Sequence, residues 1–258
     1  MKRYLLCPQP DAAAEVRQET TEPPEPGPGE VRVSLAAASL NYRDLLMKSG
    51  QSASSSSASV VPLSDGAGTV DAVGDGVADW EVGDRVALTL FRDWESGRYD
   101  MKYHGAARGG SCDGVLSEQV VAPVRSLVAV PDYLTLEEAA TLPCAGLTAW
   151  HALMERGRPL EADQTVLVLG TGGVSIFALQ IAKAVGARVI VTSSSDAKLL
   201  RAKELGADEG INYLEDPDWD KAVYRLTEKQ GVDQVIEVGG PGTLPKSMNS
   251  VAAGGSIG

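Results

Sequence analysis

The stretch VLVLGTGGVSIFALQIAKAVGARVIVTSSSD, from Val166 to Asp196, decides the fold of this chain. The unbroken apolar run at its start predicts a strand covered on both faces, and a turn with Gly170, Gly172 and Gly173 follows directly. Glycines allow such a turn to bend tightly and to approach a ligand, and the N-terminus of the next helix favours an anion such as a pyrophosphate. The stretch therefore predicts a strand, an amphipathic helix and a second strand, the βαβ unit of a dinucleotide-binding fold.

The third position of this glycine fingerprint holds Ser175, so helix and strand are expected to pack around a hydroxymethyl group. We assign Gly170, Gly172, Gly173 and Val174 to cofactor binding. The alternative is an ordinary glycine turn between a strand and a helix, because the fingerprint gains its meaning only from its structural context.

The end of the second strand bears on the choice of dinucleotide. NAD-binding folds usually carry an Asp or Glu about 20 residues beyond the glycines, where its carboxylate holds the ribose hydroxyls. Here the strand over 189–192 runs into Ser193, Ser194 and Ser195, and Lys198 follows one turn later. Hydroxyls and an ammonium can donate hydrogen bonds to a 2′-phosphate, which a carboxylate would repel. The sequence therefore favours NADPH (NADP), held by Ser193, Ser194 and Lys198.

A structural role for the same segment is compatible with this assignment. Ser195 or Asp196 can cap a helix over Ala197 to Leu205, which Gly206 terminates. Because a helix N-terminus is itself a phosphate site, both interpretations can hold together.

The composition indicates a folded, acidic protein. Its 258 residues are 43% hydrophobic and 22% charged, which is ordinary globular usage. Thirty-five acidic against 23 basic side chains give a formal charge of −12, which argues against nucleic acid and anionic membranes as partners. The odd number of cysteines, at positions 7, 112 and 144, indicates no disulfide framework. We find no signal peptide and no run of about 20 apolar residues, so we expect a cytoplasmic location.

The pattern of predicted elements changes near residue 125. Before this point short β-rich pieces alternate with glycine and proline turns, which is typical of a compact, mainly β domain. After it strands and helices alternate, which predicts an α/β domain with a doubly wound parallel sheet. We place the domains at residues 1–125 and 126–258. The expected strands are 31–37, 68–74, 84–90, 115–123, 166–170, 188–192, one near 211, 234–238 and one starting at the chain end, and the expected helices are 136–155, 174–185, 197–205 and 219–230.

Several segments in a fixed order carry a resemblance to a known family. They are LNYRDLLMKSG, PLSDGAGTVDAVGDGV, WEVGDRV, DGVLSEQVV, TLPCAGLTAWHAL, VLGTGGVS, ELGADEGINY and VDQVIEVGG. This combination resembles the medium-chain dehydrogenase/reductase superfamily, specifically its zinc-free, quinone oxidoreductase-like branch. The resemblance spans nearly the whole chain.

The resemblance implies an N-terminal GroES-like, β-rich domain joined to a Rossmann domain, with the active site between them. It also implies a sheet that is incomplete at the C-terminus, because the family continues beyond this point and forms a homodimer through its last strand. We therefore expect a homodimer for a full-length form and not for this fragment. Tyr213, in the INY segment, resembles the family's adenosine-phosphate contact and is assigned to cofactor binding.

The same resemblance predicts the metal content residue by residue. Zinc-dependent relatives hold catalytic zinc with a cysteine, a histidine and a second cysteine, at positions that match Asn41, Ser64 and Cys144 here. One thiol cannot form a site that requires three protein ligands. Of the four cysteines in the relatives' structural-zinc lobe, only Cys112 is represented. We expect no metal, and we expect Cys144 to be a small buried packing residue.

Without a metal to polarise a carbonyl, the natural hydride acceptors are already electrophilic: quinones and α,β-unsaturated carbonyls. The protein must then orient the nicotinamide and the substrate, and hydrogen-bond the oxygen that gains charge. The resemblance places Asn41, Tyr42, Arg43 and, on the interdomain helix, Thr148 at the nicotinamide, and these are the candidate catalytic residues. Tyr42 is either a proton donor or a half-buried aromatic residue. Two acidic residues that match recurring family positions, Asp44 and Asp65, are expected to support loops as much as chemistry.

The run QSASSSSASVV, residues 51–61, stands where quinone and enoyl reductases of this resemblance carry a tyrosine and prolines at the substrate mouth. Ser52 replaces that tyrosine. Such a serine- and alanine-rich segment has little with which to grip a substrate, which weakens the prediction of an enoyl thioester.

The sequence thus predicts a zinc-independent, NADPH-dependent oxidoreductase that transfers hydride to a small-molecule quinone or α,β-unsaturated carbonyl. The alternatives are a zinc-free alcohol or aldehyde dehydrogenase and a non-catalytic NADPH-binding protein. Turnover across a panel of quinones and enones separates an enzyme from a binding protein.

Overall fold

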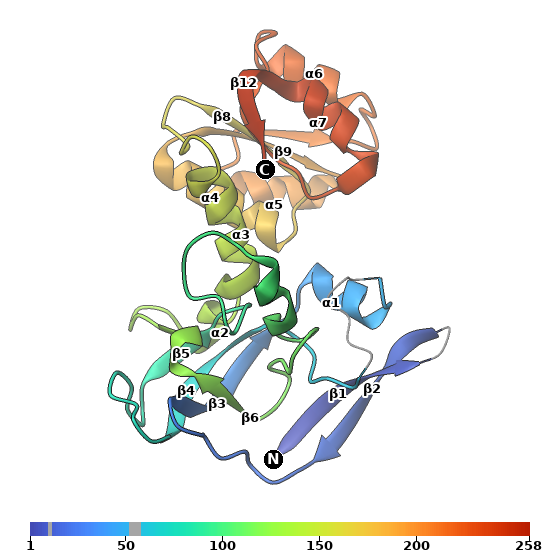
Figure 1. The fold of residues 1–258 in the computed structure, drawn as a ribbon. Coiled ribbons are helices and arrows are strands. Elements are labelled where there is room, and N and C mark those ends of the chain that lie inside the picture. Colours follow the sequence, from blue (N-terminus) through green and yellow to red (C-terminus); the bar gives the residue numbers. More distant parts are fainter. Residues whose placement is uncertain (10–11, 52–57) are drawn as a thin grey trace. The chain divides into compact units, whose positions relative to one another are not determined.

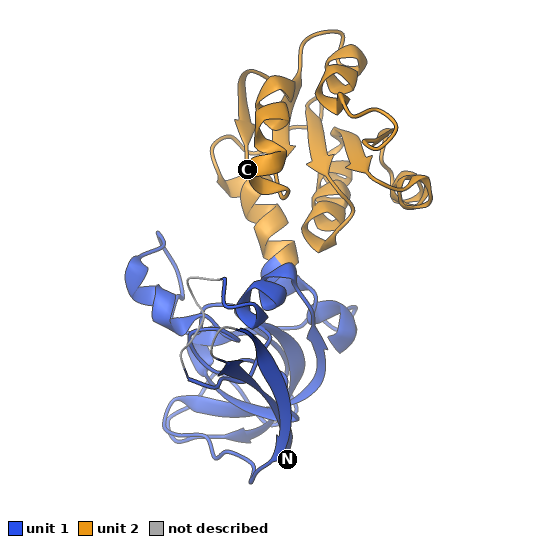
Figure 2. Ribbon diagram, turned by 90° about the vertical axis from the view of Figure 1, so that its right-hand side faces the viewer, with its two compact units in different colours: residues 1–144 blue, residues 145–258 orange. Residues whose placement is uncertain are grey.

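The computed structural model describes residues 1–9, 12–51 and 58–258. They form two compact units, Met1–Cys144 and Ala145–Gly258, coloured separately in Figure 2. The division falls after Cys144 and not near residue 125, because strand β7 (Leu127–Ala129) pairs with a strand of the first unit's sheet. No helix in the described ranges is long and apolar enough to cross a membrane.

The first unit consists of a β-hairpin and a five-stranded antiparallel sheet. The hairpin pairs β1 with β2, and the sheet has the order β6-β3-β4-β5-β7. Alternate side chains of its strands are buried and form one core with Val31, Val33, Val70, Val86 and Leu88. The strands are β1 (Lys2–Gln9), β2 (Ala12–Thr20), β3 (Glu30–Ser39), β4 (Asp65–Val73), β5 (Arg85–Leu88), β6 (Gln119–Pro123) and β7.

Two short α-helices lie in the first unit, α1 (Tyr42–Lys48) and α2 (Leu136–Ala139). Thr135 and Glu138 close a capping box at the start of α2, so its first N–H groups are satisfied locally. Segments of 3₁₀-helix lie between α1 and α2, at Met101–Ala106 and Val124–Ser126.

The second unit is built on a five-stranded parallel sheet with the order β10-β9-β8-β11-β12. This order corresponds to strands 3-2-1-4-5 of a doubly wound dinucleotide-binding sheet. Its strands are β8 (Thr165–Leu169), β9 (Arg188–Ser193), β10 (Glu209–Asn212), β11 (Val232–Ile236) and β12 (Val251–Ile257). Its α-helices are α3 (Leu147–Trp150), α4 (Gly173–Val185), α5 (Asp196–Glu204), α6 (Trp219–Leu226) and α7 (Leu244–Ser250).

Helices cover both faces of this sheet, which explains why its strands are apolar on both sides. Val166 and Val168 of β8 face α4 and α5, whereas Leu167 and Leu169 face α6. Figure 1 shows α6 and α7 on the face opposite to α4 and α5. The predicted α/β class, with a β-rich first part and a parallel doubly wound sheet, is confirmed.

Two predicted helices differ from the observed ones. The helical stretch expected over 136–155 is divided into α2, π-helical turns at Leu142–Gly146 and His151–Glu155, and α3 between these turns. The helix expected over 219–230 ends at Leu226, because Glu228 and Lys229 adopt left-handed backbone conformations with φ of 49° and 69°.

Candidate functional site

The candidate site of the first unit is a buried polar cluster around Asp65, at the start of β4. The carboxylate of Asp65 is fully buried and accepts hydrogen bonds from Ser64 Oγ (2.6 Å) and from the backbone N–H of Cys144 (2.9 Å). Burial raises the pKa of Asp65, and these hydrogen bonds act in the opposite direction. Asp65 thus links β4 to the segment before α3.

The start of α1 supplies the rest of this cluster. Asn41 is the residue before the helix, and its backbone N–H donates to Oδ2 of Asp44 at 2.7 Å. Burial raises the pKa of Asp44 as well. The amide nitrogen Nδ2 of Asn41 and the oxygen Oδ1 of Asp44 are buried and make no hydrogen bond of ordinary geometry among the described residues, although the Asn41 side chain lies close enough to Asp65 to lower the pKa of that carboxyl. A buried amide N–H of this kind is suited to an oxygen atom of a ligand.

Arg43 is held at two points. Its Nη1 donates to the backbone carbonyl of Arg108 at 3.0 Å and lies 3.8 Å from Oδ1 of Asp44. The side chain is 17% exposed, so the guanidinium is a fixed charge at the edge of the cluster. The structure therefore brings Asn41 and Arg43 together with both acidic residues.

Tyr42 does not belong to this cluster. The side chain of Tyr42 is 76% exposed on α1, which corrects the alternative of a half-buried aromatic residue. Thr148 is exposed on α3, in the second unit. Most of the serine-rich run, residues 52–57, lies outside the described residues, and with it Ser52.

The donor set at the matched zinc positions does not fit a catalytic zinc ion. The hydroxyl of Ser64 is already bonded to Asp65, and Asn41 offers an amide. Burial and the neighbouring Asp65 raise the pKa of the Cys144 thiol to about 11. Cys144 is partly rather than fully buried. Within the described ranges no three His, Cys, Asp or Glu side chains come together as a metal site.

A separate candidate site, in the second unit, lies at the carboxyl ends of β8, β9 and β10. The N–H of Gly170 donates to Thr192 Oγ1 (3.3 Å), and the N–H of Tyr213 donates to the carbonyl of Ser193 (3.0 Å). Parallel strands bring their carboxyl ends to one edge of the sheet, so the predicted cofactor residues meet there.

The glycine turn fits the phosphates of a dinucleotide. Gly170 has φ of +73°, a conformation that favours glycine, and a Cβ atom added to Gly170 or Gly172 would meet nothing within 4 Å. Helix α4 begins at Gly173 without a side-chain cap, so the N–H groups of its first turn are free to bind an anion. Ser175 is buried, and its Oγ donates to the carbonyl of Leu169 at 2.7 Å, which confirms the expected packing around this residue.

The serines after β9 are not equivalent. Ser193 is buried, and its hydroxyl accepts a hydrogen bond from the N–H of Ser195 at 3.3 Å. Ser194 and Lys198 are exposed. Ser195 precedes α5 but makes no side-chain capping bond, contrary to the capping alternative. Ser194, Lys198 and the start of α5 therefore form the exposed part of the predicted phosphate site.

Two features of the site were not predicted. Leu63, a non-glycine residue directly before Ser64, has a left-handed backbone with φ of 68°. Arg108 contributes the carbonyl that holds Arg43. The glycine-rich segment ARGGSCDG was the available signal, because glycines mark places where backbones come close.

Comparisons with known proteins agree with this architecture. Residues 27–132 match the alcohol dehydrogenase GroES-like domain, and residues 173–258 match the family described as zinc-binding dehydrogenase. A zinc-type alcohol dehydrogenase-like protein of Schizosaccharomyces pombe is 45% identical over 99% of this chain and 74% of its own length. A quinone oxidoreductase of Pseudomonas aeruginosa is 35% identical over 92% of this chain and 66% of its own length.

Solved structures are similar over the whole chain. An NAD-dependent alcohol dehydrogenase has a TM-score of 0.85 at 37% identity, with 76% of its length covered. The mycobacterial protein Rv1454c, complexed with NADPH, has a TM-score of 0.80 at 30% identity, with 73% covered. The chain therefore belongs to the medium-chain dehydrogenase/reductase superfamily, among its alcohol dehydrogenase-like and quinone oxidoreductase members. It is an oxidoreductase that binds a nicotinamide cofactor.

Proposed function

We propose that the protein is a zinc-independent, NADPH-dependent reductase of quinones or α,β-unsaturated carbonyl compounds. The observation that carries the proposal is the hydrogen-bonded network around Asp65, which occupies the positions matched to the ligands of a catalytic zinc. Without a Lewis acid there, a substrate that is already electrophilic is the chemically consistent acceptor.

NADPH is proposed over NADH on the residues that follow β9. Relatives with either cofactor share the fold, so the choice depends on local chemistry. Ser194 and Lys198 are exposed donors at this strand end, and the carboxylate of Asp196 is engaged by the side-chain amide of Asn212 at 2.8 Å. A 2′-phosphate therefore finds donors without a free competing carboxylate.

The nicotinamide supplies the hydride when the cofactor is bound. Asn41 offers a buried amide N–H, and Arg43 offers a fixed positive charge, both suited to an oxygen that gains negative charge. Asp44 and Asp65 hold these groups in place through the start of α1 and β4. Tyr42, exposed on α1, is the proposed proton donor.

A substrate panel tests this proposal. NADPH oxidation is followed with quinones, enones, aldehydes and ketones, and the reverse reaction with alcohols and NADP. The proposal expects turnover with quinones or enones and little with saturated carbonyls. Preferred turnover of alcohols and aldehydes would support the alcohol dehydrogenase alternative, and stoichiometric NADPH binding without oxidation would support a binding protein.

A further inference from the structure

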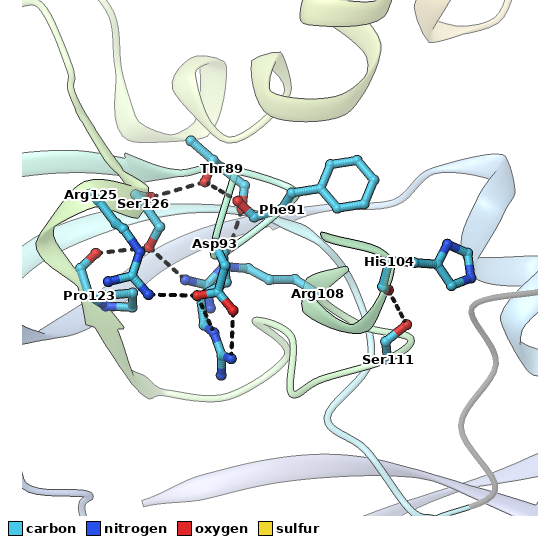
Figure 3. Close-up of polar contacts among 10 residues, drawn as sticks. Thr89, Phe91, Asp93, His104, Arg108, Ser111, Pro123, Arg125 and Ser126 are labelled. Atoms are coloured by element: carbon cyan, nitrogen blue, oxygen red, sulfur yellow. Dashed lines mark hydrogen bonds and ion pairs between the residues drawn. The ribbon is translucent and has the colours of Figure 1, made fainter. Parts of the chain in front are cut away.

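Arg108 is a buried guanidinium in the core of the first unit. Only 1% of the residue is exposed, and burial lowers its pKa to about 10. Its Nε donates to the carbonyl of Thr89 (3.2 Å), and its Nη2 donates to Ser126 Oγ (2.9 Å), as Figure 3 shows. These two acceptors fix the side chain at the end of β5.

The charge of Arg108 has no carboxylate partner among the described residues. Asp93, labelled in Figure 3, forms ion pairs with Arg125 (2.7 Å) and with Arg92 (3.0 Å). Hydrogen bonding to Arg92 is the main reason why the pKa of Asp93 is lowered to about 2. Burying a charge without an ionic partner costs free energy, so this guanidinium is an unusual core residue.

The backbone of Arg108 connects this buried anchor to the candidate site. Its N–H donates to the carbonyl of Leu90 at 3.0 Å, and its own carbonyl accepts the 3.0 Å hydrogen bond from Arg43. One residue thus carries both the buried guanidinium and the carbonyl that accepts the hydrogen bond from Arg43.

The residues that follow Arg108 pack closely against the backbone of Leu63. A Cβ atom at Gly109 would lie 2.6 Å from the backbone of Leu63, and one at Gly114 would lie 1.9 Å from its carbonyl oxygen. The N–H of Val115 donates to the same carbonyl at 3.0 Å. This close packing holds Leu63 in its left-handed conformation, directly before Ser64 and Asp65.

We propose that Arg108 is a positioning residue: it anchors the segment 108–115, which orients Arg43 through a backbone carbonyl and shapes the backbone that leads to Asp65. The inference rests on the proposed function for the role of Arg43. It adds that Arg108, which lies outside the cluster, sets the geometry of the cluster. In this arrangement the buried cation of Arg108 positions residues of the Asp65 cluster, whose donor set does not fit zinc.

A double-mutant cycle tests the proposal, with the wild type, R43M, R108M and R43M/R108M. Steady-state kinetics with NADPH and the best quinone or enone substrate give kcat/KM for each protein. We expect R108M to lower kcat/KM by about tenfold or more, the scale of a small misplacement at a reacting centre. Because part of the effect of Arg108 passes through Arg43, R108M should lower kcat/KM by a smaller factor in the R43M background than in the wild type.

Two further variants separate positioning from general loss of structure. R98M changes an exposed arginine of the same loop and should stay within about twofold of the wild type, as surface substitutions usually do. S126A removes one acceptor of Arg108 and should reduce kcat/KM in the same direction, by a smaller factor. It keeps the inference testable if R108M does not fold. The inference would be overturned if R108M kept the wild-type kcat/KM, or if S126A kept it where R108M does not fold. It would also be overturned if the factors lost in R43M and R108M multiplied to give the factor lost in R43M/R108M.

Unfolding of the same proteins in urea measures the energetic coupling between Arg43 and Arg108 and does not require turnover. Where the wild type shows no turnover, the proposed function fails, but the contact between Arg43 and the Arg108 segment is still measured. We expect R43M to change the unfolding equilibrium about threefold less in the R108M background, or in the S126A background where R108M does not fold, than in the wild type. Equal changes in both backgrounds would overturn the positioning role.

Discussion

The backbone N–H of Cys144 donates a hydrogen bond of 2.9 Å to Oδ2 of Asp65, a residue 79 positions earlier in the chain. The bond joins the segment that precedes α3 to the first residue of β4. It also places the Cys144 thiol beside a buried carboxylate, which together with burial raises the pKa of the thiol to about 11. Through this bond and the bond from Ser64 Oγ, Asp65 contacts two of the three residues at the matched zinc positions.

Substitution of Asp65 should reveal a pH-dependent contribution to stability. Its pKa is raised in the folded chain, so the folded state keeps a proton that the unfolded state loses. The contribution is present below the unfolded pKa of about 3.9 and is lost as the pH rises through the folded pKa. Relative to Asp65→Asn, the wild type should therefore gain stability as the pH falls from neutral. Urea unfolding at a series of pH values measures this difference.

Asp79→Asn is the control for this experiment, because Asp79 is an exposed carboxylate in the same unit. Its stability difference from the wild type should vary much less with pH. If the difference for Asp65→Asn were constant, or changed in the opposite sense, burial would not dominate the ionisation of Asp65.

Ser175 should contribute to stability through its buried hydroxyl. In Ser175→Ala the hydrogen bond to the carbonyl of Leu169 is lost, and we expect a loss of about 1 kcal/mol in the free energy of unfolding. Ser194→Ala, an exposed serine in the same unit, should change stability by less than about 0.5 kcal/mol. Equal effects of the two substitutions in denaturant titrations would argue against the packing described for Ser175.

Gly172→Ala should weaken cofactor binding without weakening the fold. Gly172 has φ of −78°, and an added Cβ meets nothing within 4 Å, so the substitution introduces neither strain nor a clash. If the pyrophosphate occupies this open space, the methyl group will obstruct it. We expect NADPH affinity to fall by about tenfold or more in calorimetric titrations, about 1.4 kcal/mol, at an unchanged melting temperature.

Gly105→Ala is the matched control, because it is also free of neighbours within 4 Å and lies in the first unit. It should leave both quantities unchanged. Unaltered NADPH affinity in Gly172→Ala would place the dinucleotide elsewhere.

Lys198 should determine the preference for NADPH. Lys198→Ala removes a charge-assisted hydrogen bond to the 2′-phosphate and should cost about 1 to 3 kcal/mol in NADPH binding, with NADH binding nearly unchanged. Lys203→Ala, an exposed lysine on the same helix, should affect neither cofactor. Equal affinity of the wild-type protein for the two cofactors would contradict the assignment.

The second unit could be predicted largely from the sequence, because its information is local. The apolar run of β8, the glycines and the amphipathic α4 each have a distinct pattern, and their order determines a parallel sheet. The predicted helix over 219–230 failed at its end, where the left-handed backbones of Glu228 and Lys229 override helix propensity.

The polar cluster of the first unit could be predicted only in part. Asn41 and Arg43 were assigned from the resemblance, but their partners depend on contacts across long sequence separations. The carbonyl of Arg108, which holds Arg43, is 65 residues away, and a backbone acceptor has no signature in sequence. Likewise, the burial of Ser193 and the exposure of Ser194 follow from how β9 ends and could not be read from three consecutive serines.

The most direct test of the central claim combines metal analysis with a single turnover. Protein that has not been exposed to a chelator is analysed for zinc, loaded with NADPH deuterated at the transferred C4 position, and mixed rapidly with a quinone or an enone. The account predicts far less than one zinc per chain, oxidation of the bound NADPH, and transfer of deuterium with a slower rate than for unlabelled cofactor. Tightly held zinc at one per chain, with turnover that disappears when the zinc is removed and returns when it is restored, would contradict the account.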